Sequence, residues 1–310
     1  MVLAAFFFAS MGVCVKFASA SFNSAELVFY RGVIGVAFMA LLARSQGIGL
    51  GTRYPGMHAW RSTIGVFSMG AWFYAIAHLP LATAMTLNYM SSVWIAAFLV
   101  GGALLSWRPV AKSADADYDG APAGVAAPVV QAPLVLTVLA GFAGVVMMLQ
   151  PSLDGGSGFA GLIGLLSGFS AAFAYMQVMA LSRLGEPEAR TVFYFAVGSA
   201  VAGAGGMVFT GLSPWDWHAA VWLVPIGLLA AGGQLSMTRA YARAGSKSAM
   251  LVVANLQYSG LLFAAAYSIV LFGDKITTVG WIGMALIVGS GIAATVLRAR
   301  AAPDAPAEEH

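Results

Sequence analysis

Two basic residues, Lys16 and Arg31, lie inside long apolar runs of the sequence, where no water is at hand to solvate a charge. A charged side chain at the centre of a membrane-spanning helix costs at least about 2.5–3.5 kcal/mol, so such residues are functional candidates by default. Lys16 is expected near a helix end, where a lysine can extend to the lipid headgroups instead. Arg31 is expected about one turn into its helix. There it either pairs with Glu26 or with a helix end elsewhere, or it holds a substrate carboxylate or frames the outer gate.

Uncharged polar side chains recur at spacings of three or four residues along three further apolar segments. Side chains so spaced share one helical surface, and an amide facing lipid would lack a partner. These surfaces therefore face inward, where they either line a cavity or bond neighbouring helices. The three sets are Asn88, Ser91 and Ser92; Gln234, Thr238 and Tyr241; and Asn255, Tyr258 and Ser259.

These patterns predict a central substrate cavity with aromatic walls and several amides. Its candidate lining residues are Arg31, Trp72, Asn88, Tyr89, Ser92, Tyr175, Gln234, Thr238, Asn255 and Tyr258. The candidates for a gate or for ion coupling are Lys16, Glu26, His78 and Asp274. No Asp or Glu is expected at a helix centre, so the usual proton relay of buried acids is not visible. Facilitated diffusion, exchange and ion coupling all remain open.

The composition predicts that membrane helices position these residues. The 310-residue chain is 60% apolar and 9% charged, whereas soluble domains carry about 25% charged residues. Crossing about 30 Å of hydrocarbon takes about 20 helical residues, with a range of about 17–25. Ten segments approximate this length: Val2–Ala20, Leu27–Ala43, Ser62–Leu79, Ala82–Leu105, Leu134–Leu149, Gly158–Leu181, Thr191–Leu212, Ala219–Met237, Ser248–Phe272 and Ile276–Leu297.

The basic residues of the loops predict the orientation, because Lys and Arg accumulate on the cytoplasmic side. With the N-terminus inside, all but one of the loop and tail residues of this kind are cytoplasmic, and only Lys275 lies outside. The chain is therefore expected in a bacterial inner membrane, multi-pass, with both termini cytoplasmic. The expected cytoplasmic set is Arg44, Arg53, Arg61, Arg108, Lys112, Arg183, Arg190, Arg239, Arg243, Lys247, Arg298 and Arg300.

The two halves of the chain resemble each other. Residues 28–30 (Val-Phe-Tyr) recur 164 positions later as residues 192–194. Because five helices per half is an odd number, the second half would enter the membrane inverted, as in many secondary transporters. We expect an all-α membrane fold with repeats at 1–150 and 157–298, a cytoplasmic linker at 107–133, and a disordered tail at 299–310.

With ten helices in two copies, Arg31 early in the second helix and the sequence Ala-Ile-Ala-His-Leu-Pro-Leu-Ala-Thr-Ala at 75–84, the chain resembles the EamA family of the drug/metabolite transporter superfamily. The resemblance covers residues 2 to about 298. It implies an exporter or permease for amino acids or other small metabolites that works without ATP hydrolysis. An acidic residue usually follows the fourth and ninth helices in this family. Asp274 matches the second position, whereas residues 106–108 (Ser-Trp-Arg) depart from the first.

We therefore expect a secondary transporter of a small organic metabolite, such as an amino acid or a related zwitterion or anion, working by alternating access. A carrier of a larger planar metabolite, such as a vitamin or a nucleoside-like compound, and a non-transporting membrane scaffold are the alternatives. An enzyme is not expected, because the four histidines are scattered and helix centres contain no acids. The expected partners are the substrate, the lipid bilayer and a second copy of the chain as a homodimer, with no nucleic acid, cofactor or metal.

Overall fold

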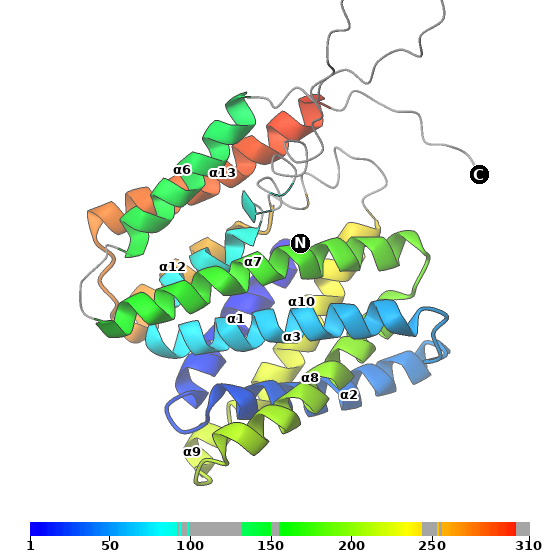
Figure 1. The fold of residues 1–310 in the computed structure, drawn as a ribbon. Helices are drawn as coiled ribbons and strands as arrows, with labels where there is room; N and C mark the ends of the chain where they lie inside the picture. The colour runs from blue at the N-terminus through cyan, green and yellow to red at the C-terminus, as the bar shows by residue number, and fades with distance from the viewer. Residues whose placement is uncertain are drawn as a thin grey trace, which may run out of the picture.

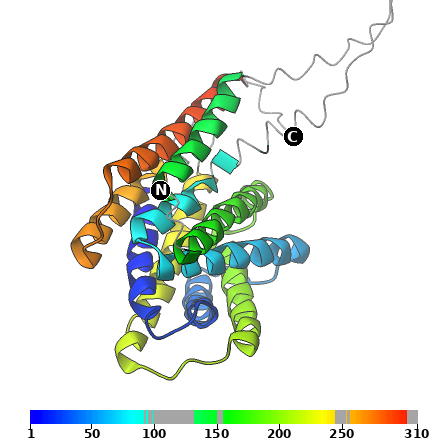
Figure 2. The ribbon, with the colours of Figure 1, turned by 60° about the vertical axis from the view of Figure 1, so that its left-hand side comes forward.

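The computed structural model describes residues 1–91, 93, 94, 98, 132–149, 155–243, 253 and 256–301, and its regular elements there are helices without strands. The helices cross one another in a bundle, with α6 and α13 side by side along one flank (Figures 1 and 2). Their bounds are α1 Val2–Ala18, α2 Ser24–Ser45, α3 Pro55–His78, α4 Leu81–Tyr89, α6 Ala132–Leu149, α7 Gly155–Arg183, α8 Glu188–Thr210, α9 Trp217–Ala220, α10 Leu223–Ala242, α12 Ser259–Phe272 and α13 Thr278–Ala301.

Four of the described helical stretches are long and apolar enough to cross a membrane, and four shorter apolar helices accompany them. Large apolar side chains on the outside of the bundle face the surroundings, with Leu41, Phe209 and Val270 each at least 70% exposed. Exposed apolar area on this scale marks a surface that contacts something other than water. The protein is therefore an all-helical membrane protein. The four long stretches are Ser24–Ser45, Gly158–Arg183, Glu188–Thr210 and Trp217–Ala242.

Helix α3 starts seven residues before the expected segment, at Pro55 instead of Ser62. Proline suits the first helical position because its fixed φ fits the helix and its missing N–H would be unsatisfied there anyway. The stretch from 55 to 61 contains His58 and Arg61, which a hydropathy reading assigns to a loop. The early start carries both residues into the bundle, where they are 2% and 3% exposed.

The expected fourth and ninth segments are each interrupted near the middle. Helix α4 ends at Tyr89 and a turn follows at Met90, whose N–H points to the carbonyls of both Thr86 and Leu87. Helix α12 begins at Ser259 after a turn at 257–258. The expectation of one continuous helix in each place was therefore wrong. An interrupted helix offers backbone groups at membrane depth, which is tolerated where they line a cavity or are buried in protein.

The longest helix–helix contact joins α2 and α8, which lie side by side (Figure 1). Glycines make the approach close: a Cβ at Gly32 would lie 2.3 Å from the backbone N of Ala200, and one at Gly203 would lie 2.5 Å from that of Phe29. Without a hydrophobic driving force in lipid, such small-residue contacts supply the packing between helices. The fold thus depends on glycine at both positions.

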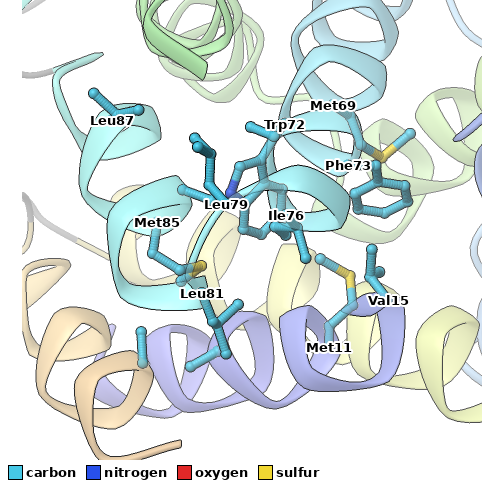
Figure 3. Packing of buried hydrophobic residues seen from close by; sticks show 14 of the residues in the cluster. Met11, Val15, Met69, Trp72, Phe73, Ile76, Leu79, Leu81, Met85 and Leu87 are labelled. Carbon is cyan, nitrogen blue, oxygen red and sulfur yellow. The ribbon is translucent and has the colours of Figure 1, made fainter. Parts of the chain in front are cut away.

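The core lies where α1, α3 and α4 meet (Figure 3). Met11 of α1, Ile76 of α3 and Leu81 and Met85 of α4 are fully buried there. The turn at Pro80 reverses the chain between α3 and α4, since proline cannot continue a helix and favours an extended residue before it. This packed core forms one wall of the cavity described next.

Candidate functional site

A cavity of about 60 Å³ lies in the middle of the bundle, between α1, α2, α3, α4, α7, α8 and α10. Its wall combines two arginines and two amides with aromatic and small apolar residues. Six of the ten residues predicted from the sequence are among them. The lining consists of Phe8, Met11, Arg31, Arg61, Gly65, Ser68, Met69, Trp72, Asn88, Tyr89, Ala171, Ala174, Tyr175, Phe195 and Gln234.

Arg31 enters the cavity from α2, about two turns from the start of that helix. Its Nη1 donates a hydrogen bond to Ser199 Oγ at 3.1 Å, and its guanidinium carbon lies 4.9 Å from the centre of the Phe195 ring. The pairing of Arg31 with Glu26 that the sequence left open does not occur: Glu26 bonds to Ser213 instead. The Nε of Arg31 is buried without a hydrogen-bond partner.

Arg61 enters the same cavity from α3 and is the main residue that sequence reasoning missed. The sequence predicts it among the cytoplasmic loop residues, and the loop assignment is wrong because α3 begins at Pro55. Its Nη2 donates to Gln234 Oε1 at 3.2 Å, and its guanidinium carbon lies 4.0 Å from the Phe195 ring centre. Its Nε and Nη1 are buried without partners. Reading Pro55 as a helix start would have placed Arg61 in the second turn.

Phe195 of α8 therefore contacts both guanidinium groups. An arginine near an aromatic face gains about 0.5–2 kcal/mol from the ring quadrupole. The two guanidinium carbons are at most about 9 Å apart, because they lie 4.9 and 4.0 Å from the same ring centre. The Phe195 ring thus contacts two positively charged guanidinium groups beside one small cavity.

No acidic residue in the described ranges lines this cavity, and neither arginine forms an ion pair there. Of the five described acids, Glu26, Glu186, Asp216 and Asp274 each bond elsewhere, and Glu188 at the start of α8 does not line the cavity. Buried charges in proteins are normally paired, because an isolated ion in a medium of low dielectric constant is very costly. Two unpaired cations around an internal space therefore indicate a receptor for an anionic group.

The remaining predicted residues fall into three groups. Trp72, Asn88, Tyr89, Tyr175 and Gln234 line the cavity with Arg31. Thr238 does not, because its hydroxyl bonds back to the Gln234 carbonyl at 2.8 Å. Tyr258 lies in the turn before α12, with its ring 6.3 Å from that of Tyr89. Ser92 and Asn255 lie outside the described residues.

Several amides and hydroxyls of the wall form hydrogen bonds to other segments of the bundle. Asn88 Nδ2 of α4 donates to Ser167 Oγ of α7 at 3.1 Å. Gln257 Nε2 donates to the Tyr175 hydroxyl at 3.4 Å. The indole nitrogen of Trp72 and the hydroxyl of Tyr89 are buried without partners. The wall thus offers mainly hydrogen-bond donors to whatever occupies the cavity.

One end of the bundle is closed around Glu26, at the start of α2. This carboxylate, 1% exposed, accepts hydrogen bonds from the backbone N–H and the hydroxyl of Ser213 at 2.8 and 2.7 Å, and from the Asn23 N–H at 2.8 Å. Ser21 Oγ donates to Asp216 at 2.7 Å in the same place. This bond, with the backbone N–H of His218, holds the pKa of Asp216 below its ordinary value. These contacts tie the α1–α2 loop to the α8–α9 loop, and we call them the Glu26 end.

The opposite end is closed around Glu186, in the loop between α7 and α8. Its carboxylate accepts from Thr52 Oγ1 at 2.7 Å and pairs with Arg190 Nη1 at 3.0 Å, and His58 Nε2 lies 3.8 Å away. Arg190 also donates to the Gly49 carbonyl at 2.8 and 3.0 Å. Burial alone would raise the pKa of Glu186, but the bonds from Thr52 and Arg190 outweigh it and keep the pKa below its ordinary value. This network, the Glu186 end, ties the α2–α3 loop to the α7–α8 loop.

The other gate candidates have local roles. Lys16 Nζ donates to the Leu79 carbonyl at 2.7 Å and lies 5.2 Å from the Phe272 ring centre, so it caps the end of α3. His78 Nδ1 contacts its own helix at the Tyr74 carbonyl, 2.8 Å away. Asp274 bonds to Ser268 at the end of α12. None of these three lines the cavity.

A larger hollow of about 830 Å³ lies between α12 and α13, but its chemistry is different. Apolar side chains such as Leu262, Ile269 and Trp281 form most of its wall, and these are 73%, 47% and 42% exposed. Charged side chains are absent from its lining, which consists of described residues. We regard it as part of the surface that faces hydrocarbon and place the candidate site in the smaller central cavity.

Comparison with known proteins gives a consistent result. Residues 1–105 match the EamA-like transporter family. The chain is 29% identical over 296 residues to a pseudopaline exporter, CntI, of Pseudomonas aeruginosa, covering 94% of this chain and 93% of the relative. It is 28% identical over 249 residues to a riboflavin transporter of Rhizobium johnstonii, covering 79% and 74%.

A protein of known crystal structure aligns over 96% of both chains with a TM-score of 0.58 at 20% identity, which shows a shared fold. The relatives, which align with 79% to 94% of this chain, are named as exporters and transporters, not as enzymes. The expected membrane transport class is therefore confirmed. The N-terminal third of the chain thus matches the EamA-like transporter family, and its relatives over 94% of the chain are named as exporters.

Proposed function

We propose that this protein is a secondary transporter that moves a small, negatively charged organic metabolite through the central cavity by alternating access. The observation that carries the proposal is the pair of buried guanidinium groups of Arg31 and Arg61, which face one internal cavity without an acidic partner among the described residues. An isolated buried charge is costly to keep, and an anionic substrate would repay that cost. The expected substrate class of amino acids and related anions is the starting point.

A larger planar metabolite, such as a vitamin, is the second candidate. The relative named as a riboflavin transporter and the aromatic residues Trp72, Tyr89 and Tyr175 favour it. The cavity of about 60 Å³ is well below the roughly 300–1,000 Å³ of ordinary ligand sites. Either substrate requires the helices to separate, and a vitamin requires the larger separation.

The hydrogen-bonded contacts at both ends of the bundle fit an occluded intermediate of alternating access. The Glu26 end and the Glu186 end are both tied by hydrogen bonds, and the cavity lies in the bundle between them. Alternating access requires that one end opens while the other stays closed. We propose that the loop contacts of Glu26 and Arg190 are the two gates.

We further propose ten spanning helices arranged as two inverted five-helix repeats, at 1–150 and 157–298. Helices α1, α2, α3, α4 and α6 would correspond to α7, α8, α10, α12 and α13. If each helix is exchanged for its counterpart, the contact between α1 and α10 becomes the contact between α7 and α3. In the same way, the contact between α1 and α12 becomes the contact between α7 and α4. All four contacts are present. The pairs α2 with α8, α4 with α12 and α6 with α13 map onto themselves and also pack together.

The two gates support the same symmetry at the level of single residues. Adding 164 to Glu26 and Gly49 gives Arg190 and Ser213. Glu26 binds Ser213, and Arg190 binds Gly49. Each contact is therefore the counterpart of the other, as a two-fold axis in the membrane plane would produce. We propose further that both termini lie on the cytoplasmic side of a bacterial inner membrane, which the bias of basic residues in the loops supports.

The test begins with metabolite profiling of cells with and without the gene, followed by flux of the leading compound in proteoliposomes. A carrier gives saturable flux that unlabelled substrate on the opposite side accelerates, whereas a channel gives no such acceleration. Arg31→Gln should abolish flux, and Arg44→Gln, an exposed position on the same helix, should not. Full transport by Arg31→Gln at normal expression would contradict the proposal. Absence of flux for every profiled metabolite would favour a scaffold.

A further inference from the structure

The charges of the residues that line the cavity limit the charge that its substrate can carry. An arginine side chain stays protonated in proteins even when it is buried, so Arg31 and Arg61 bring two positive charges to the cavity. Among the described lining residues no carboxylate offsets them.

We infer that the substrate is a compact organic dianion, with its two negative charges at opposite ends or on one phosphate group. This inference rests on the proposed transport function and narrows it. A monoanion would leave one guanidinium uncompensated. A zwitterion would also leave one guanidinium uncompensated, and it would bring its ammonium group into a wall that has two cations and no acid among the described residues. The amino-acid class favoured by the sequence therefore fits this cavity less well than a diacid does.

The hydrogen-bonding groups agree with the charge argument. Each guanidinium donates a hydrogen bond to the protein from one nitrogen, Arg31 to Ser199 and Arg61 to Gln234. The buried Nε of both residues and Nη1 of Arg61 have no partner. Arginine binds carboxylate and phosphate through pairs of such N–H groups. The free donors thus come from both guanidinium groups, which lie at most about 9 Å apart.

The geometry also limits the size of the substrate. Both guanidinium groups contact the same Phe195 ring, so the two anionic groups must reach donors that lie beside one aromatic side chain. A chain of a few carbon atoms between two carboxylates spans this distance, as does a small phosphate ester that engages both arginines with one group. A bulky dianion would also have to displace the ring.

The test compares four probes of similar size on purified protein: succinate, glycerol 3-phosphate, butyrate and 4-aminobutyrate. These supply two carboxylates, one phosphate, one carboxylate and a zwitterion. Dissociation constants are measured at fixed ionic strength, and flux of each labelled probe is measured in proteoliposomes. One charge-assisted interaction is worth about 1.5–3 kcal/mol, so succinate or glycerol 3-phosphate should bind about 10- to 100-fold tighter than butyrate and 4-aminobutyrate. The tighter of the two dianions distinguishes a diacid from a phosphate ester.

The variants test whether the arginines set this selectivity. In Arg61→Gln and in Arg31→Gln, one charge is removed, so the preference for dianion over butyrate should fall to about threefold or less. The matched controls Arg53→Gln and Arg44→Gln remove exposed arginines and should retain the wild-type preference. Arg31→Lys and Arg61→Lys keep the charge, so they should retain a dianion preference even where the Gln variants fail to fold.

The outcomes separate this inference from the transport proposal. Equal or tighter binding of butyrate or 4-aminobutyrate by the wild type, with saturable flux, would overturn the dianion class and leave the carrier standing. A dianion preference that survives in both Gln variants would overturn the assignment to these arginines. Dianion binding without flux of any probe would support the receptor and count against the carrier.

Discussion

Arg61 and Arg190 are arginines of the same bundle in opposite situations. Arg190 belongs to the Glu186 end, where it pairs with a carboxylate at 3.0 Å and bonds to a backbone carbonyl. Arg61, on α3 one turn beyond His58, is 3% exposed and has two nitrogens without partners. A charge whose partners come from the protein stabilises the fold, whereas a buried charge left without them costs stability and is available to a ligand. The comparison predicts opposite effects of neutralising the two groups.

The largest effect is expected from removing both cavity charges. In the double variant Arg31→Met and Arg61→Met, flux of the substrate should fall at least about 100-fold, since two charge-assisted contacts of about 1.5–3 kcal/mol each are lost. Stability without substrate should stay the same or rise, because methionine fills the space of the arginine stem without a buried charge. Thermal unfolding of the purified protein measures the second part. A loss of stability comparable to that of Glu186→Gln would contradict the comparison.

The next effect is the converse one at the Glu186 end. Glu186→Gln keeps the size of the side chain but leaves Arg190 without its carboxylate. Removing one partner of a buried pair costs about 3–5 kcal/mol, and we expect about 2–3 kcal/mol because Arg190 is 19% exposed. Binding of succinate should remain within about threefold of the wild type. Thermal or denaturant unfolding measures the loss, and Glu188→Gln on the next helix is the matched control. A stable variant with impaired binding would reverse the assignment.

The same carboxylate should make stability depend on pH. The folded-state pKa of Glu186 lies below its ordinary value of 4.5. The stabilisation is therefore complete above that value and is lost as the pH falls through the lowered folded-state pKa. The difference in melting temperature between wild type and Glu186→Gln should be constant from pH 7 to 5.5 and shrink below pH 4.5. Asp216→Asn should show the same sign at the Glu26 end, because the pKa of that acid is lowered too. A difference that grows at low pH would contradict the sign.

How far the sequence predicts this arrangement depends on the kind of signal each residue gives. Arg31 was identifiable because it interrupts an apolar run, and Asn88 and Gln234 because they repeat at helical spacing in such runs. Arg61 was assigned to a loop, since the polar stretch before it hides the start of α3 at Pro55. A hydropathy pattern measures average apolarity and cannot locate a helix end that lies in a polar segment.

Partner choice was less predictable still. Glu26 was expected near Arg31, five residues along the same helix, but it accepts bonds from Ser213, 187 positions away. Phe195, which contacts both arginines, looked like any other apolar residue of its helix. Long-range contacts depend on how the helices cross, and that depends on close approaches such as the one at Gly32 and Ala200. The 164-residue repeat was the one sequence signal that reached across the two halves.

A smaller effect is expected at the Glu26 end. Glu26→Gln weakens the charge-assisted bonds to Ser213, and we expect a loss of about 1–2 kcal/mol from this contact. The loop between α8 and α9 should open more often, so the Ser213 amide should exchange its hydrogen about 5- to 30-fold faster. Hydrogen exchange with mass spectrometry measures this on peptides covering 211–216, with peptides at 48–52 as the internal control. Faster exchange at both ends would show global loosening in place of one gate.

The smallest effect is expected from removing two tyrosine hydroxyls. These uncharged groups differ in the same way as the arginines, because one has a hydrogen-bond partner in the protein and the other has none. The hydroxyl of Tyr194 donates to the Leu50 carbonyl at 2.9 Å at the Glu186 end, whereas that of Tyr89 is buried beside the cavity without a partner. Tyr194→Phe should cost about 1 kcal/mol of stability and leave binding unchanged, since it removes one formed bond. Tyr89→Phe should leave stability unchanged or slightly higher, and should weaken substrate binding by a few fold where the hydroxyl serves the ligand. Because both changes delete one oxygen atom, unfolding and binding measured on the same preparations compare them directly. Equal destabilisation by the two variants would show that the Tyr89 hydroxyl bonds within the protein. The arginines alone would then distinguish the two ends of the bundle, where polar groups have partners, from the cavity, where they do not.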